Sequence, residues 1–262
     1  MLSLRFTLSF TRFIPFIFFH LKNPIAYVAA YFKNRNQAAH FYNGLIVPTD
    51  SRLSFGFVNA IFFQKIYGKP EKNWQTIVDI GANRGYFSLF AAQNAPNAHI
   101  YAIEPFGETF GVLNKNRALN HLESRIETFN FAISDTDGYS PFYMGEDLLD
   151  HSLRPDILEK QQSTLVETRS LSHFMDTQNI EKIDMLKMNC EGSEYAILMN
   201  LPIVYLQRIK HIRLEYHTYE PDLTIDILAH YLENQGFDCV RIKRFHVKHG
   251  IAWFEKVKSK EI

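Results

Sequence analysis

The stretch that decides the fold of this chain is Val78-Asp79-Ile80-Gly81-Ala82-Asn83-Arg84-Gly85-Tyr86-Phe87-Ser88. It closes a short apolar run that begins at Thr76, and it opens a second apolar run that continues to Ala92. This pattern predicts a strand, a tight loop and a helix. Glycines in the loop let the backbone pass close to a ligand, and free N–H groups at the helix start attract an anionic group such as a carboxylate. A nucleotide-like ligand is therefore expected at this loop.

The spacing of the loop argues against two common nucleotide sites. A dinucleotide fold reads G-x-G-x-x-G and a P-loop needs G-K-[ST] after its glycines, whereas this loop reads D-x-G-x-N-x-G. An acidic residue, Glu104, ends the next predicted strand, where its carboxylate can accept hydrogen bonds from both hydroxyls of a ribose. S-adenosylmethionine offers a ribose, a charged amino-acid tail and no phosphate. The sequence therefore predicts S-adenosylmethionine as the cofactor.

From residue 76 onward, predicted strands and helices alternate. The strands are expected at 76–80, 98–103, 125–131, 165–169, 183–188 and 211–216. The helices are expected at 85–93, 107–120, 171–177, 193–205 and 223–235. A hairpin-like run covers 139–144, and closing strands are expected near 237–242 and 251–254. This order predicts an α/β fold with a doubly wound parallel sheet that ends in an antiparallel edge hairpin.

Five motifs in order resemble those of the FkbM-type methyltransferases. They read V-D-I-G-A-N-R-G-Y-F-S (78–88), A-I-E-P-F (102–106), F-A-I-S-D-T-D-G (131–138), I-D-M-L-K-M-N-C-E-G-S-E-Y (183–195) and I-R-L-E-Y-H (212–217). The likeness covers about residues 41 to 242. It implies a class I, Rossmann-like methyltransferase that O-methylates a hydroxyl. The acceptors it implies are sugars of a glycan, lipid-linked saccharides or secondary metabolites.

Ligands bind such sheets at the carboxyl ends of the strands, near the switch in strand order. Phe131, or the backbone after it, is expected to form the wall beside the adenine. The predicted cofactor-binding residues are Asp79, Gly81, Ala82, Asn83, Gly85, Tyr86, Glu104, Phe131, Ala132 and Asn189.

Three residues are candidates for catalysis. His217 follows a predicted strand directly and titrates near neutral pH, so it is the first candidate for the base, although a hydrogen-bonding histidine at a strand end is the alternative. Glu191 faces the cleft if the following helix begins at Gly192. His151 lies in the irregular run from 145 to 163, and long loops over strand ends often form lids. Lys187 is expected to pair with a carboxylate such as Glu191 or Asp184.

Position 189 departs from the pattern of the resembling family. The family commonly reads L-K-x-D-x-E-G at this strand end, whereas this chain has Asn189. An amide cannot act as a base and is a poor ligand for a hard metal. No essential metal is therefore expected.

Alternative functions remain at this point. One is N-methylation of a small amine or a nucleobase, and another is a non-catalytic cofactor-binding scaffold in a biosynthetic complex. A nucleic-acid partner is not expected, because the net charge is zero and the body of the chain is acidic. An NAD-dependent oxidoreductase is disfavoured by the missing third glycine.

Composition indicates a globular chain of 262 residues with 46% hydrophobic and 21% charged residues. Residues 1–70 are expected to form an aromatic-rich helical and hairpin extension, and residues 71–262 the methyltransferase domain. The extension is expected to contain a hairpin that turns at Asn43-Gly44 and a helix over 57–67. Two cysteines provide no disulfide framework, so the expected location is the cytoplasm.

The first 70 residues are basic, with eight Lys or Arg and one acid, Asp50. Arg12 and Pro15 interrupt the apolar clusters, so neither a signal peptide nor a spanning helix is expected. Two interpretations of residues 1–33 stay open. Short helices pack on the core, or a basic aromatic surface contacts a second copy of the chain or the inner face of an anionic membrane.

Overall fold

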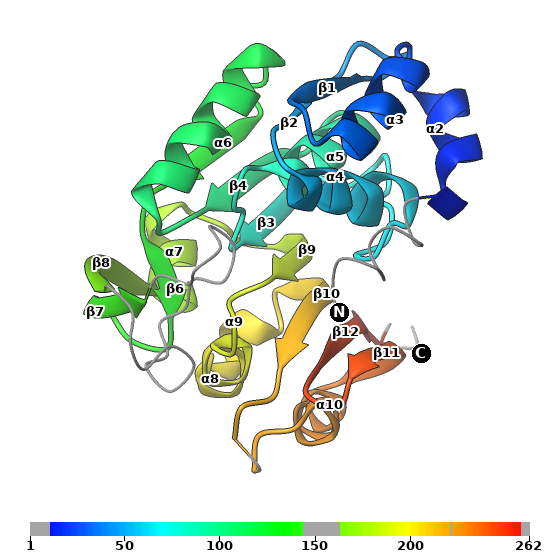
Figure 1. The fold of residues 1–262 in the computed structure, drawn as a ribbon. Coiled ribbons are helices and arrows are strands. Elements are labelled where there is room, and N and C mark those ends of the chain that lie inside the picture. The colour runs from blue at the N-terminus through cyan, green and yellow to red at the C-terminus, as the bar shows by residue number, and fades with distance from the viewer. Residues whose placement is uncertain (1–10, 144–162, 221, 258–262) are drawn as a thin grey trace.

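The fold is described from a computed structural model, which describes residues 11–143, 163–220 and 222–257 (Figure 1). In it the apolar run at 76–80 forms a strand at the middle of the large sheet. The strands are β1 (Gln37–His40), β2 (Ile46–Thr49), β3 (Thr76–Ile80), β4 (His99–Ile103), β5 (Ile126–Phe129), β6 (Ala132–Ser134), β7 (Gly138–Tyr143), β8 (Ser163–Ser170), β9 (Ile183–Met188), β10 (Ile209–His217), β11 (Phe237–His246) and β12 (His249–Lys256).

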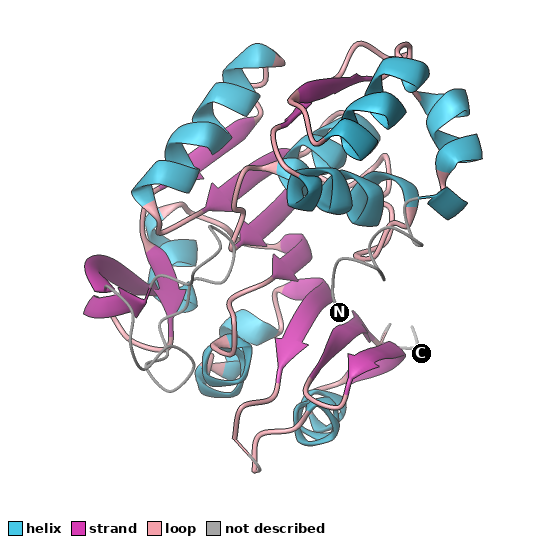
Figure 2. Ribbon diagram, viewed as in Figure 1, coloured by secondary structure: helices cyan, strands magenta, loops and turns pink. Residues whose placement is uncertain are grey.

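The helices connect these strands (Figure 2). They are α2 (Ile14–His20), α3 (Pro24–Lys33), α4 (Arg52–Val58), the π-helix η1 (Asn59–Phe63), α5 (Tyr86–Asn94), α6 (Gly107–Leu119), α7 (Leu171–Thr177), α8 (Glu194–Asn200), α9 (Ile203–Leu206) and α10 (Ile225–Asn234). The longest described helix, α6, has 13 residues, and none of the described helices is long and apolar enough to cross a bilayer.

The large sheet has seven strands in the order β11-β12-β10-β9-β3-β4-β5. Strands β10, β9, β3, β4 and β5 are parallel, while β12 runs antiparallel to both β10 and β11. The predicted doubly wound sheet with an antiparallel edge hairpin is confirmed. The chain passes from β3 to β4 and β5 on one side and then to β9 and β10 on the other, so the strand order switches between β3 and β9.

Alternating side chains of the sheet supply two cores. On one face, Ile77 of β3 packs in a cluster with residues of α5 and α6 and with the aromatic residues of the extension. On the other face, Val78 and Ile80 pack with residues of α7, α8, α9 and α10. Because strand side chains alternate between faces, β3, β4 and β9 contribute to both cores.

The extension, which includes α4 and η1, lies against α5 and α6 and shares their core (Figure 1). Its hairpin, β1 and β2, pairs from Gln37↔Thr49 to His40↔Ile46 and turns through Gly44, as predicted. The helix predicted at 57–67 instead begins at Arg52, because the Ser51 side chain accepts a hydrogen bond from the Ser54 N–H and caps it.

Two other predicted elements are interrupted. The strand expected at 125–131 breaks at Asn130, whose Nδ2 donates to the carbonyl oxygens of Glu104 (2.9 Å) and Pro105 (3.0 Å). Beyond it, β6 joins a small sheet with β8 and β7. The helix expected at 193–205 is split into α8 and α9, because Pro202 cannot continue a helix.

Candidate functional site

The loop after β3 has a backbone that needs glycine. Gly81 has φ +69°, and a Cβ there would lie 1.9 Å from the carbonyl oxygen of Asn189 at the end of β9. Gly85 has φ +78° and precedes α5. The ends of β3 and β9, the two strands at the switch in strand order, therefore lie so close together that position 81 has no room for a side chain.

Asp79 is fully buried beneath this loop. Its Oδ1 lies 2.9 Å from Lys187 Nζ, and its Oδ2 accepts a hydrogen bond of 2.6 Å from the Ser88 hydroxyl. Lys187 also donates to the carbonyl oxygen of Gly81 at 2.8 Å. The predicted pairing of Lys187 with Glu191 or Asp184 is wrong, because β3 and β9 pair in the register that sets Asp79 opposite Lys187.

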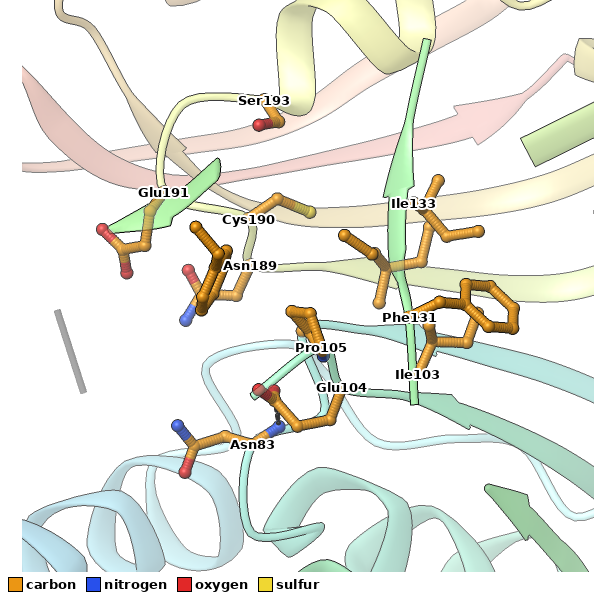
Figure 3. Close-up of a pocket in the computed structure, with 14 residues that line it drawn as sticks. Asn83, Ile103, Glu104, Pro105, Phe131, Ile133, Asn189, Cys190, Glu191 and Ser193 are labelled. Atoms are coloured by element: carbon orange, nitrogen blue, oxygen red, sulfur yellow. Dashed lines mark hydrogen bonds between the residues drawn. The ribbon is translucent and has the colours of Figure 1, made fainter. Parts of the chain in front are cut away.

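Glu104 is buried at the end of β4. One carboxylate oxygen accepts the Asn83 N–H and the other accepts the Phe106 N–H, both at 2.9 Å (Figure 3). Burial raises the pKa of Glu104 to about 7, although the two backbone hydrogen bonds act in the opposite direction. A ligand that needs the carboxylate therefore competes with a proton near neutral pH.

A cavity opens over these strand ends. Figure 3 shows Glu104 and Asn83 on one side of it, Asn189 and Glu191 on another, and Phe131 with Ile133 beside them. The lining residues are Ile80, Gly81, Asn83, Ile103, Glu104, Pro105, Phe131, Ala132, Ile133, Phe142, Asn189, Cys190, Glu191 and Ser193. Asn189 Oδ1 is buried and accepts no hydrogen bond from the described residues. It is an acceptor to which a ligand or a water can donate.

The structure brings most of the predicted cofactor residues to this cavity. Those that line it are Gly81, Asn83, Glu104, Phe131, Ala132 and Asn189. The four that lie outside its lining support the loop instead: Asp79, Ala82, Gly85 and Tyr86, whose hydroxyl donates to the Pro48 carbonyl at 2.9 Å.

Several lining residues were missed by the sequence analysis. Ile80 and Ile103 end predicted strands, so their place was open to prediction, whereas Phe142 reaches the cavity from the small sheet and carries no sequence signal. Cys190 also lines the cavity, and burial raises the pKa of its thiol, which keeps it protonated and unreactive.

His217 lies at the end of β10, next to the cavity, between two carboxylates. Its Nε2 lies 3.3 Å from Glu191 Oε2, and its Nδ1 lies 3.3 Å from Glu194 Oε1. Burial alone would lower the pKa of His217, but Glu194, Glu191 and Glu215 together raise it to about 9. Of the three predicted catalytic residues, His217 and Glu191 are brought together, and His151 lies outside the described residues.

Glu194 and Glu215 complete the surroundings of His217. Glu194 is fully buried and accepts the N–H groups of Cys190 (2.8 Å) and Gly192 (2.9 Å). Glu215 accepts a hydrogen bond from the Tyr67 hydroxyl at 2.9 Å and lies 2.5 Å from His249 Nε2. Burial would raise the pKa of Glu215, but these contacts lower it.

Comparisons with known proteins identify the family of this chain. Residues 79–239 match the methyltransferase FkbM domain. The chain belongs to the FkbM methyltransferase family. Methyltransferase sdnD of Sordaria araneosa is 28% identical over 194 residues, which are 63% of this chain and 74% of that protein. The 31-O-demethyl-FK506 methyltransferase FkbM of Streptomyces tacrolimicus is 25% identical over 216 residues, 69% of this chain and 80% of that protein.

Among solved structures, M. capricolum TrmK in complex with S-adenosyl-homocysteine is one of those that match this chain. It has a TM-score of 0.48 and 14% identity, over 76% of this chain and 70% of that chain. M. jannaschii TYW2 in complex with AdoMet has a TM-score of 0.46 and 17% identity, over 86% of this chain and 88% of that chain.

This FkbM-family methyltransferase uses S-adenosylmethionine as its cofactor. The cavity offers groups that suit this molecule: the Glu104 carboxylate would accept hydrogen bonds from the ribose hydroxyls, and the Phe131 ring would form an apolar wall beside the adenine. The buried Asn189 oxygen needs a donor, and the cofactor has N–H and O–H donors to satisfy it.

Proposed function

We propose that this enzyme transfers the methyl group of S-adenosylmethionine to a hydroxyl of a sugar, a glycan or a secondary metabolite. The observation that carries this proposal is the contact between Glu191 and His217. Glu191 lines the cofactor cavity, and its carboxylate lies within 3.3 Å of an imidazole that is held from behind by Glu194. The relative from Streptomyces tacrolimicus is named for a hydroxyl of the natural product FK506, which favours the same chemistry.

When bound, S-adenosylmethionine supplies an electrophilic methyl group whose carbon–sulfur bond breaks as the acceptor oxygen attacks, with the electron pair staying on sulfur. Glu191 accepts the O–H hydrogen bond of the acceptor and takes its proton as charge develops on the oxygen. His217 orients the Glu191 carboxylate through Nε2. Positioning of the acceptor against the methyl group provides most of the rate enhancement.

The test is release of S-adenosylhomocysteine over a panel of hydroxyl acceptors, with amine analogues of matched shape beside each one. We expect turnover with hydroxyl acceptors and loss of it in Glu191→Gln. Turnover with the amines alone would replace this proposal with N-methylation. Cofactor binding without turnover on any acceptor would favour the non-catalytic scaffold.

A further inference from the structure

A cluster of nitrogen and oxygen ligands lies beside the cofactor cavity, where β10 ends and β12 begins. One ligand atom from each of Glu215, His217 and His249 lies within 4.8 Å of the other two. Two ligands on opposite sides of one ion, each bonded at about 2.1 Å, are separated by about 4 Å. His249 Nε2 and Glu215 Oε1 lie 2.5 Å apart, so an ion would replace this hydrogen bond, and the His249 ring, which is 37% exposed, has room to turn as the two atoms separate.

The buried His217 and the half-buried Glu215 are both held by further hydrogen bonds. His217 Nδ1 is bound to Glu194, which is itself fixed by two backbone N–H groups, so Nε2 faces the cluster. Tyr67 donates to Glu215 Oε2, which leaves Oε1 directed at His249. Histidines that bind metals almost always donate their other ring nitrogen to a carboxylate or carbonyl in this manner.

Glu191 adds a fourth ligand on the side of the cavity. Its Oε2 lies 3.3 Å from His217 Nε2, a separation that two neighbouring ligands of one ion have. Glu191 also lines the cavity, so an ion in this cluster would lie at the boundary between cofactor and acceptor.

We propose that Glu215, His217 and His249, with Glu191 as a fourth ligand, bind one divalent transition-metal ion such as Mn²⁺ or Zn²⁺. Two imidazoles with two carboxylates suit these ions better than Mg²⁺ or Ca²⁺, which prefer oxygen ligands alone. The ion's role rests on the proposed function: it would displace the proton of His217 Nε2 and orient Glu191 in its place. It would also bind the acceptor hydroxyl and lower its pKa, so that the proton leaves more readily to the second oxygen of Glu191. The expectation of no essential metal considered only Asn189, which takes no part in this cluster.

The experiment is titration of the chelator-treated full chain with MnCl2 and, separately, with ZnCl2, by calorimetry. We expect one ion per chain, with affinity reduced at least tenfold in His249→Ala and in Glu215→Gln. His230→Ala provides the matched control, because His230 is exposed on α10 and contacts only Asn234 among the described residues. A stoichiometry of zero, or binding that both site variants leave intact, would overturn the proposal.

A parallel titration with S-adenosylhomocysteine separates this proposal from the proposed function. A chain that binds no ion but binds S-adenosylhomocysteine and methylates hydroxyl acceptors refutes the metal site and leaves the proposed function standing. A chain that binds the ion at this cluster and methylates no hydroxyl acceptor supports the site and refutes the proposed function.

A second inference comes from the opposite end of the molecule, where α2 and α3 form the outer edge of the extension (Figure 1). Five large apolar side chains are exposed there: Phe16, Phe18, Phe19, Ile25 and Phe32. Four exposed bases accompany them, Arg12, Lys22, Lys33 and Arg35, and residues 1–49 contain no acid. Aromatic side chains beside uncompensated positive charge complement an anionic lipid surface.

We propose that α2 and α3 bind the surface of an anionic membrane. The full chain is sedimented with phosphatidylglycerol vesicles and with phosphatidylcholine vesicles, at low and at high salt. We expect binding to the anionic vesicles at low salt, and loss of it in the double variant Phe19→Asp with Ile25→Asp. Leu165→Asp, which changes an exposed apolar residue of β8, serves as the control and retains binding.

Two outcomes would overturn the membrane proposal. One is the absence of binding to anionic vesicles at low salt. The other is a dimer in analytical ultracentrifugation that the double variant dissociates, which would assign this face to a second copy of the chain.

Discussion

Replacement of Glu104 by glutamine tests the cofactor site most directly. The carboxylate is buried and already accepts two backbone N–H groups at 2.9 Å, from Asn83 and Phe106. Glutamine keeps the volume of the side chain but exchanges one acceptor oxygen for an NH2 donor. That donor faces either a backbone N–H or the hydroxyl of the ligand.

The expected loss of affinity in Glu104→Gln follows from the number of hydrogen bonds that the carboxylate can still accept from a ligand. Its two oxygens offer about four lone-pair sites, and the protein uses two of them. A hydrogen bond to a charged group contributes about 1.5–3 kcal/mol. We therefore expect Glu104→Gln to weaken binding of S-adenosylhomocysteine by about 10- to 150-fold.

The assay is calorimetric titration at pH 8, with a thermal melt of each variant to show that it is folded. Glu108→Gln is the control, because Glu108 is an exposed acid in the first turn of α6. A folded Glu104→Gln protein with unchanged affinity would show that the ribose is bound by another group.

The raised pKa of Glu104 adds a pH dependence to the same prediction. In the free protein the carboxyl is protonated below about pH 7, whereas the ligand requires the ionised form. We expect wild-type affinity to fall about tenfold for each pH unit below 7 and to level off above it, with proton release on binding. Because this folded-state pKa is above the ordinary value, the carboxyl's contribution to folding stability is lost as the pH rises through 7. Glu104→Gln should show a flat profile.

Three further variants address the loop, its support and catalysis. Gly81→Ala should abolish cofactor binding and lower the melting temperature, because its Cβ would lie 1.9 Å from a carbonyl oxygen; Gly111→Ala, with open space around it, should do neither. Lys187→Met should lower the free energy of unfolding in urea by about 3–5 kcal/mol, because it leaves Asp79 charged and buried, and a loss below about 1 kcal/mol would contradict the pairing. His217→Asn should reduce turnover about 100-fold with S-adenosylhomocysteine affinity within about twofold of wild type, and an unaltered turnover would remove it from catalysis.

The sheet and the loop were open to prediction because their signals are local. The apolar run 76–80, the two glycines and the acid at 104 lie on consecutive elements, and the rule that parallel sheets bind ligands at strand ends joins them. Asp79 was predicted to bind the cofactor because the sequence marks it as an acid beside a glycine turn, whereas in the structure it is buried beneath the loop and paired with Lys187. Its orientation is set by the register with Lys187, more than 100 residues away.

The residues around Glu215 could not be predicted either, because they also come from positions far apart in the sequence. His249 lies near the last predicted hairpin and Tyr67 ends a predicted helix of the extension, and neither position was predicted to belong to the site. Both reach Glu215 only because β12 inserts beside β10 and the extension lies against the sheet. The break at Asn130 was also missed, since its side-chain bonds to Glu104 and Pro105 have no periodic signature.

The hydrogen bond from Tyr67 to Glu215 defines how much of the chain a working fragment must contain. The match to the FkbM domain begins at residue 79, so a fragment cut to that match would lack this donor. Glu215 would then keep its carboxylate in a buried position without the group that orients it. In chimeras between family members, the segment through residue 67 and β10 should therefore come from the same parent, because the Tyr67–Glu215 hydrogen bond needs one residue from each.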